Sequence, residues 1–163
     1  MGIDPGLALT GWGIINYSAK AVKLVDFGSI ATPAKTSLAE RLKDIFTDMQ
    51  SLIRKFKPDI VAVEKLFFNT NAKTALLVGQ ARGAIMLAAA LTNANIQEFT
   101  PLQIKLNVAG YGHAEKIQVQ RMVQRLLDLA TLPKPDDAAD ALAVAITCAY
   151  TKTENYSKLV TKL

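Results

Sequence analysis

The chain has 163 residues, half of them hydrophobic, which allows one domain with a sizeable core and excludes a chain disordered throughout. Its net charge of +5 favours an acidic partner, most commonly nucleic acid, although many basic proteins bind none. The lone cysteine, Cys148, excludes a disulfide within the chain, which fits the reducing cytoplasm, and its apolar neighbours favour a small buried residue.

We expect no membrane-spanning segment. The most apolar stretch, from Ala138 to Tyr150, is shorter than the roughly 20 apolar residues of a membrane-spanning helix, and Asp140 interrupts it. The opening residues, Met1 to Asp4, have neither the basic start nor the apolar core of a signal peptide. The sequence therefore predicts a soluble, cytoplasmic protein.

The first part of the chain predicts antiparallel strands. Gly2–Asp4 is typical of a strand end and is followed by the turn signal Pro5-Gly6. This strand is short, which suggests that residues precede Met1. Gly11–Asn16 and Val22–Ile30 are rich in residues that favour strands and are separated by a polar turn.

A helix and a buried strand are predicted next. Ser37 can cap the helix, with Glu40 as the capping-box partner. Apolar residues then repeat at helical spacing from Leu38 to Phe56. Ile60–Val63 is a short continuous apolar run, typical of a strand buried on both faces, and it ends at Glu64.

The second half predicts helices around one more strand. The expected elements are a helix over 71–93, a strand over 96–99, and helices over 102–108, 115–127 and 137–150. Strands that first form hairpins and then alternate with helices indicate an α/β fold with a mixed sheet. We expect a single domain over 1–150 and a polar, frayed tail over 151–163.

Two glycines, Gly79 and Gly83, lie inside the long predicted helix. Each costs up to about 1 kcal/mol relative to alanine at such a position. Because alanines surround them, close helix packing is the expected compensation.

Carboxylates occupy three positions that structure alone does not explain. Asp4 and Glu64 each end a predicted strand, and Asp140 lies in a helix whose neighbours are apolar all round. A carboxylate buried there is costly unless something pairs with it, and a hard cation such as Mg²⁺ is a suitable partner. Asp137, three residues earlier, projects from the same helix face.

Each carboxylate also has an ordinary explanation. Asp4 alone fits a turn, Glu64 alone fits a wet strand end, and Asp137 alone fits a helix N-cap, for which Asp136 competes. The combination is more specific than any member, because acidic residues from two strand ends and one buried helix suit a two-metal phosphodiester site.

Four segments together resemble the motifs of the RuvC family of Holliday junction resolvases, in the right order and spacing. They are Gly2-Ile3-Asp4-Pro5-Gly6 with Thr10-Gly11-Trp12-Gly13; Val63-Glu64-Lys65-Leu66-Phe67-Phe68 with Gly79-Gln80-Ala81-Arg82-Gly83; Gln103-Ile104-Lys105 with Gly110 to Lys116; and Asp137-Ala138-Ala139-Asp140.

The resemblance implies a ribonuclease H-like fold, with a mixed five-stranded sheet flanked by helices. It implies a homodimer that nicks two strands of a four-way DNA junction symmetrically during recombination and repair, leaving 5′-phosphate and 3′-hydroxyl ends. It implies that Asp4, Glu64, Asp137 and Asp140 hold two Mg²⁺ ions per site, for which Mn²⁺ can substitute. The implied partner is the RuvA–RuvB branch-migration complex.

Three further residues carry over from the family. Phe67 matches an aromatic side chain that stacks on bases, although a core position is an equal alternative from the residues alone. Lys105 and Lys116 match lysines near the scissile phosphate and would otherwise be ordinary surface charges. Lys116 also opens a helix, where backbone N–H groups favour phosphate. His113 has no second soft ligand beside it, so we expect no zinc site there.

Two other classes of function remain as alternatives. A nucleic-acid-binding module could share the fold without cutting, but carboxylates gathered near phosphates would repel DNA unless a metal ion intervened. An actin-like phosphotransfer domain also starts with aspartate and glycines after a strand, but it leaves the helix bearing Asp137 and Asp140 unexplained.

Overall fold

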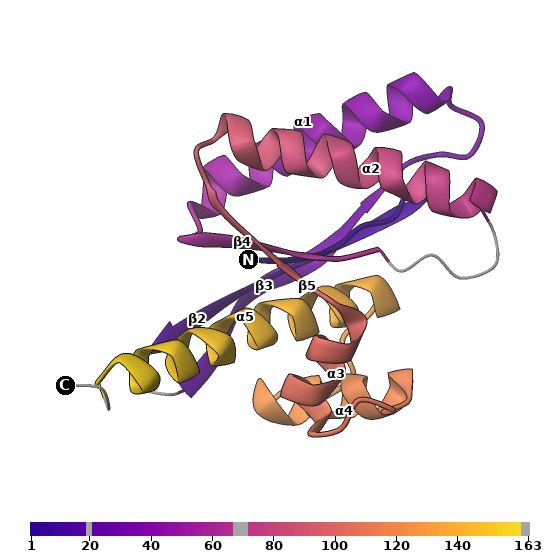
Figure 1. Cartoon of the computed structure of the whole chain (residues 1–163). Coiled ribbons are helices and arrows are strands. Elements are labelled where there is room, and N and C mark those ends of the chain that lie inside the picture. The colour runs from indigo at the N-terminus through magenta and orange to yellow at the C-terminus, as the bar shows by residue number, and fades with distance from the viewer. Residues whose placement is uncertain (19–20, 67–71, 161–163) are drawn as a thin grey trace.

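The computed structural model describes residues 1–18, 21–66 and 72–160, and in this part of the chain one five-stranded sheet is covered by helices on both faces (Figure 1). The strands are β1 (Gly2–Asp4), β2 (Leu9–Ser18), β3 (Ala21–Ala31), β4 (Ile60–Glu64) and β5 (Asn95–Phe99). Their order across the sheet is β3-β2-β1-β4-β5, so the short first strand is central.

The sheet is mixed, as expected. β1 pairs antiparallel with β2 and parallel with β4, while β3 pairs antiparallel with β2 and β5 pairs parallel with β4. Ile3 lies opposite Val63 in the β1–β4 register. The carboxyl ends of β1 and β4 therefore meet at the same edge of the sheet.

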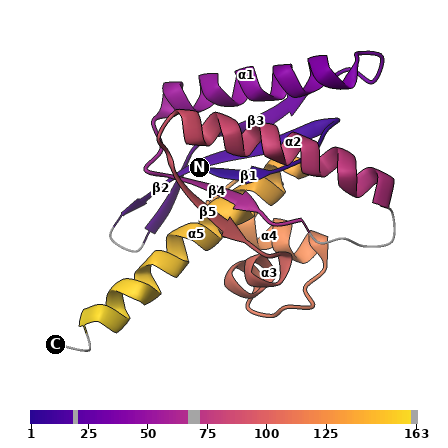
Figure 2. The same ribbon diagram turned by 45° about the horizontal axis from the view of Figure 1, so that its top comes forward.

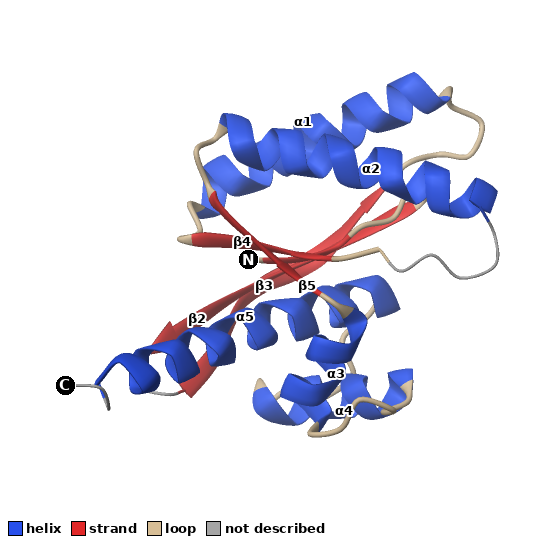
Figure 3. Cartoon of the chain, viewed as in Figure 1, coloured by secondary structure: helices blue, strands red, loops and turns tan. Residues whose placement is uncertain are grey.

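Two helix layers sandwich the sheet (Figure 2, Figure 3). α1 and α2 lie side by side on one face, and α5 crosses the other face with α3 and α4 packed against it. The helices are α1 (Leu38–Phe56), α2 (Ala72–Leu91), α3 (Pro101–Ala109), α4 (Lys116–Leu126) and α5 (Asp136–Val160).

The predicted capping box begins α1. Ser37 Oγ accepts a hydrogen bond from the backbone N–H of Glu40 at 3.3 Å, and Glu40 Oε2 accepts one from the backbone N–H of Ser37 at 3.1 Å. The helix ends where Lys57 adopts a left-handed conformation and donates its N–H to the carbonyl of Ile53. One face of α1 enters the core, with Ile45 and Met49 fully buried.

α5 packs unusually close to the sheet because glycines face it. A Cβ atom at Gly11 would lie 1.9 Å from the carbonyl oxygen of Asp137, and one at Gly2 would lie 2.1 Å from that of Ala141. Residues 138 and 139 and residues 141–149 of the helix are buried, as its all-round apolar sequence predicts. These contacts fix the first turn of α5 beside the ends of β1 and β2.

α5 also corrects a boundary. The sequence places its end near Tyr150 and a frayed tail after it, whereas the helix continues to Val160. Thr147 and Thr151 are tied into the helix by hydrogen bonds from their hydroxyls to the carbonyls of Ala143 and Thr147, at 2.9 and 2.8 Å. Polar side chains therefore do not end the helix here.

The sequence predicts no membrane-spanning segment, and α2 matches such a segment by length and composition only. Its Thr74–Leu91 stretch has a mean hydropathy of 1.5, and 22% of it is buried. Its charged residue, Arg82, forms an ion pair with Glu98 of β5. Leu76 and Leu91 are 64% and 60% exposed, so α2 presents an apolar outer face.

The glycines of α2 are only partly explained by packing within the chain. A Cβ atom at Gly79 would touch the side chain of Leu66 at an ordinary 3.8 Å, while one at Gly83 would meet open space. The close packing expected at Gly83 is therefore not found among the described residues.

Candidate active site

Asp4 and Glu64 lie next to each other at one edge of the sheet, where β1 and β4 end. The turn after Asp4 is held by two buried threonines. The Thr10 hydroxyl donates to the carbonyl of Gly6 at 2.7 Å, and the Thr32 hydroxyl donates to that of Leu7 at 2.5 Å. These bonds fix the backbone that carries Asp4.

α5 brings the other two predicted carboxylates to the same edge. The helix begins at Asp136, so Asp137 and Asp140 project from its first two turns, close to where the helix contacts Gly11. Asp140 is only 23% exposed. The structure thus brings Asp4, Glu64, Asp137 and Asp140 together from three separate parts of the sequence.

A cleft opens over Asp4, Glu64 and Asp140, but not Asp137, and two predicted lysines line it. The cleft residues are Asp4, Glu64, Pro101, Ile104, Lys105, Lys116, Val119, Asp140 and Ala143. Thr100 and Gln103 form a capping box at the start of α3, and at the start of α4 the side chain of Gln118 accepts a hydrogen bond from the backbone N–H of Glu115 at 2.8 Å. Lys116 is therefore the first residue of its helix, as predicted.

Burial and mutual repulsion disturb the titration of the carboxylates. Burial, then the charges of Glu64, Asp140 and Asp137, raise the pKa of Asp4 to about 8. Burial, then the charge of Asp140, raise the pKa of Glu64 to about 7. At neutral pH the cluster therefore retains a proton that separate carboxylates would have lost.

Asp140 is paired even without a metal ion. Its Oδ2 lies 2.8 Å from Lys116 Nζ. Burial raises the pKa of Asp140, and the hydrogen bond from Lys116 partly offsets that rise. Burial alone would lower the pKa of Lys116, but the hydrogen bond and charge of Asp140 outweigh it, so the pKa lies above its ordinary value. The partner that the buried carboxylate requires is thus a lysine in this structure.

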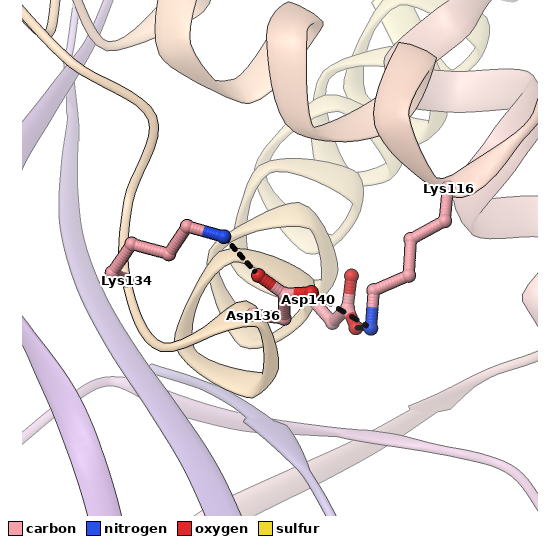
Figure 4. Close-up of polar contacts among 4 residues, drawn as sticks. All are labelled: Lys116, Lys134, Asp136 and Asp140. Carbon is pink, nitrogen blue, oxygen red and sulfur yellow. Dashed lines mark hydrogen bonds and ion pairs between the residues drawn. The ribbon is translucent and has the colours of Figure 1, made fainter.

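The two adjacent aspartates at the start of α5, Asp136 and Asp137, have different surroundings. Asp136 pairs with Lys134, Oδ1 to Nζ, at 2.7 Å, and its Oδ2 lies 4.0 Å from Lys116 Nζ (Figure 4). The charge of Asp137 is among those that raise the pKa of Asp4. The choice of Asp137 for the cluster, which the residues alone leave open, agrees with this arrangement.

The carboxylates have the chemistry that a hard cation requires, but their side chains do not converge on one point in this structure. Among the described residues, no three histidine, cysteine, aspartate or glutamate side chains converge closely enough to hold a metal ion. The donors are nevertheless all oxygen, which Mg²⁺ prefers, and a divalent ion would offset both the burial and the mutual repulsion that raise the pKa values of Asp4 and Glu64. The residues present therefore fit such an ion.

The remaining predicted residues differ in their placement. Lys105 of α3 lines the cleft, Phe67 lies outside the described residues, and His113 is an exposed loop residue away from the cleft lining. Lys134, which the structure places against Asp136, is not among the residues singled out from the sequence. Only the fold shows that this loop lysine reaches the start of α5.

The chain is similar to a group of known nucleases. A family model described as crossover junction endodeoxyribonuclease RuvC matches residues 1–148. The protein of that name from Alkaliphilus oremlandii is 56% identical over 151 residues, which cover 93% of this chain and 92% of the relative. The one from Halothermothrix orenii is 56% identical over 146 residues, covering 90% and 88%.

Solved structures give the same result for the fold. A structure described as Thermus thermophilus RuvC in complex with Holliday junction substrate matches with a TM-score of 0.88 and 34% sequence identity, and the match covers 94% of each chain. This likeness confirms the expected ribonuclease H-like mixed five-stranded sheet flanked by helices.

Proposed function

This chain belongs to the RuvC family of crossover junction endodeoxyribonucleases, and we propose that it resolves Holliday junctions by paired, symmetric nicking of two strands during recombination and repair. The observation that carries the proposal is the cleft in which carboxylates from β1, β4 and α5 lie beside Lys105 and Lys116. A module that only binds DNA gains nothing from acidic residues at this position, because they repel phosphate.

Asp4, Glu64, Asp137 and Asp140 are the proposed ligands of two Mg²⁺ ions, for which Mn²⁺ can substitute. When bound, two such ions supply an activated water and stabilise the leaving oxygen of a phosphodiester. The products are then a 5′-phosphate and a 3′-hydroxyl. The carboxylates hold the cations, while Lys105 and Lys116 offer positive charge to the phosphate at the open side of the cleft.

The acidic cluster cannot by itself attract DNA, so other groups are assigned to binding. The net charge of +5 favours the phosphate backbone, and Phe67 is proposed to stack on bases near the crossover. The RuvA–RuvB branch-migration complex is the proposed partner on the same DNA, and the cytoplasm is the proposed compartment.

A homodimer is proposed because a four-way junction presents two equivalent strands to cut. The apolar outer face of α2 supports this assembly: Leu76, Leu87 and Leu91 are all more than half exposed, and Gly83 leaves room beside them for another backbone. Two copies related by a two-fold axis through this face would each contribute one cleft.

A synthetic four-way junction incubated with and without Mg²⁺ tests the proposed function. We expect symmetric nicks in opposite strands only when the metal ion is present, with linear duplex of the same sequence left uncut. Junction binding without cleavage at any Mg²⁺ or Mn²⁺ concentration would support a binding module instead. Nucleotide hydrolysis without cleavage would support the phosphotransfer alternative.

A further inference from the structure

The ammonium group of Lys116 has two carboxylates of α5 within reach (Figure 4). Its Nζ lies 2.8 Å from Asp140 Oδ2 and 4.0 Å from Asp136 Oδ2. The second carboxylate is in turn held by Lys134, whose Nζ lies 2.7 Å from Asp136 Oδ1. The four side chains form a row of alternating charge along the start of α5.

Asp140 has two partners: Lys116 in the structure, and a metal ion in the proposed reaction. It accepts a hydrogen bond from Lys116, and it is also one of the carboxylates proposed to hold Mg²⁺. A divalent ion at Asp140 repels an ammonium group that lies this close, and it neutralises the charge to which the ammonium group is attracted. Lys116 and the metal ion therefore compete for Asp140.

We propose that Asp136 is a positioning residue that accepts the Lys116 ammonium group when a metal ion binds Asp140. This inference rests on the proposed function only in taking Asp140 as a metal ligand. The transfer requires little movement, since closing the 4.0 Å separation to an ordinary charged hydrogen bond is a shift of about 1 Å. Lys116 then remains at the cleft, where phosphate is expected, without occupying a ligand oxygen.

Lys134 holds the Asp136 side chain in an orientation that suits this role. By binding Oδ1 it leaves Oδ2 directed toward Lys116 (Figure 4).

The proposal can be separated from a general electrostatic effect. If Asp136 only adds negative charge near the metal ion, removing that charge weakens metal binding whether or not Lys116 is present. If Asp136 acts by accepting Lys116, its removal matters only while Lys116 is there to compete for Asp140. A double-mutant cycle between the two positions distinguishes these cases.

The test is calorimetric titration of the whole chain with Mn²⁺, without DNA, for the parent, Asp136→Asn, Lys116→Gln and the double variant. We expect Asp136→Asn to weaken Mn²⁺ binding about two- to fivefold in the parent, the range of exposed ion pairs, and to have no effect in Lys116→Gln. Asp44→Asn removes an exposed carboxylate of α1 on the opposite face of the sheet and should leave binding unchanged.

Junction cleavage supplies the second measurement. At low Mn²⁺ the Asp136→Asn variant should cut more slowly than the parent, and at saturating Mn²⁺ its rate should recover, with junction affinity and melting temperature unchanged. Equal weakening of Mn²⁺ binding in both backgrounds, or none in either, would overturn the role of Asp136 and leave the nuclease proposal intact. A parent chain that binds no Mn²⁺ would overturn the metal site itself.

Discussion

Substitution of Asp140 should affect DNA cleavage much more strongly than DNA binding. Asp140→Asn keeps the shape of the side chain, removes a proposed ligand charge and cannot add repulsion toward phosphate. We expect cleavage of a four-way junction to fall by orders of magnitude, since the reacting oxygens lose their stabilisation, while junction affinity stays within several-fold. Cleavage is measured under single turnover and binding by gel shift.

The metal-free stability of this variant is a separate test of the site. Loss of the ion pair with Lys116 and relief of a mostly buried charge act in opposite directions, so the free energy of unfolding should change by no more than about 1 kcal/mol. Mg²⁺-dependent nicking by Asp140→Asn at the parental rate would refute the proposed ligand set.

The raised pKa values of Asp4 and Glu64 predict how stability depends on pH without metal. The pKa of Asp4 rises from an ordinary 3.8 to about 8 on folding, so between these values the native state holds a proton that the unfolded chain has lost. The free energy of unfolding should therefore fall as pH rises through this range and level off above it. Glu64 contributes with the same sign between 4.5 and about 7.

Thermal melts in a chelator at a series of pH values measure this effect. Asp4→Asn should remove much of the slope, because its amide does not titrate, and saturating Mg²⁺ should flatten the slope in the parent by favouring ionised carboxylates. A parent and an Asp4→Asn variant with parallel pH profiles would show that Asp4 titrates normally.

The sequence identifies the site residues to different degrees. Asp140 can be singled out because its neighbours are all apolar, and the structure places it in the cleft. Asp136 and Asp137 cannot be told apart from residue type, because both fit the start of a helix; their surroundings in space separate them. Lys134 carries no signal of its own in the sequence, although its partner Asp136 is only two residues further on.

At the scale of whole elements, the approach of α5 to the sheet is the feature most open to a direct test. Gly11→Ala would place a Cβ atom 1.9 Å from the carbonyl oxygen of Asp137, so strand and helix must separate. We expect a loss of about 1–3 kcal/mol in the free energy of unfolding, typical of overpacking, together with reduced cleavage.

Denaturant unfolding and the junction assay measure both effects in the same variant. Gly83→Ala is the matched control, because its Cβ atom meets open space and alanine favours a helix. It should leave the chain's own fold at least as stable. A Gly11→Ala variant with parental stability and cleavage would mean that α5 can shift without disturbing its carboxylates.

Elements with a local signal are predicted well, and those that depend on distant contacts are not. The capping box and apolar spacing of α1 place its limits correctly, and the apolar run of β4 identifies a strand with a neighbour on each side. The order of the strands and the closeness of α5 to β1 depend on contacts between residues far apart in the chain. The apolar exterior of α2 follows from which side faces the sheet, which its nearly uniform composition does not reveal.

At the scale of the whole molecule, the proposed dimer can be tested by a substitution on the outer face of α2. Leu87→Lys places a charge on the outer face of α2, where the side chain is 53% exposed in the single chain. We expect this variant to be monomeric by light scattering at micromolar concentration, with an unchanged fold and with nicks that are no longer paired. Val25→Lys on β3, also 53% exposed, is the matched control and should remain dimeric.

The central position of β1 has a consequence for synthesis of the protein. Among the described elements, β1 leaves the ribosome before the other strands, whereas α5, which supplies two of the proposed carboxylates, leaves after the other helices. Contacts between the two ends of a chain form late, because the intervening segments must first be made and folded. A nascent chain stalled before Asp136 would carry Asp4 and Glu64 but would lack Asp137, Asp140 and the contact of α5 with Gly2 and Gly11. We therefore expect an incomplete chain to have no nuclease activity during translation.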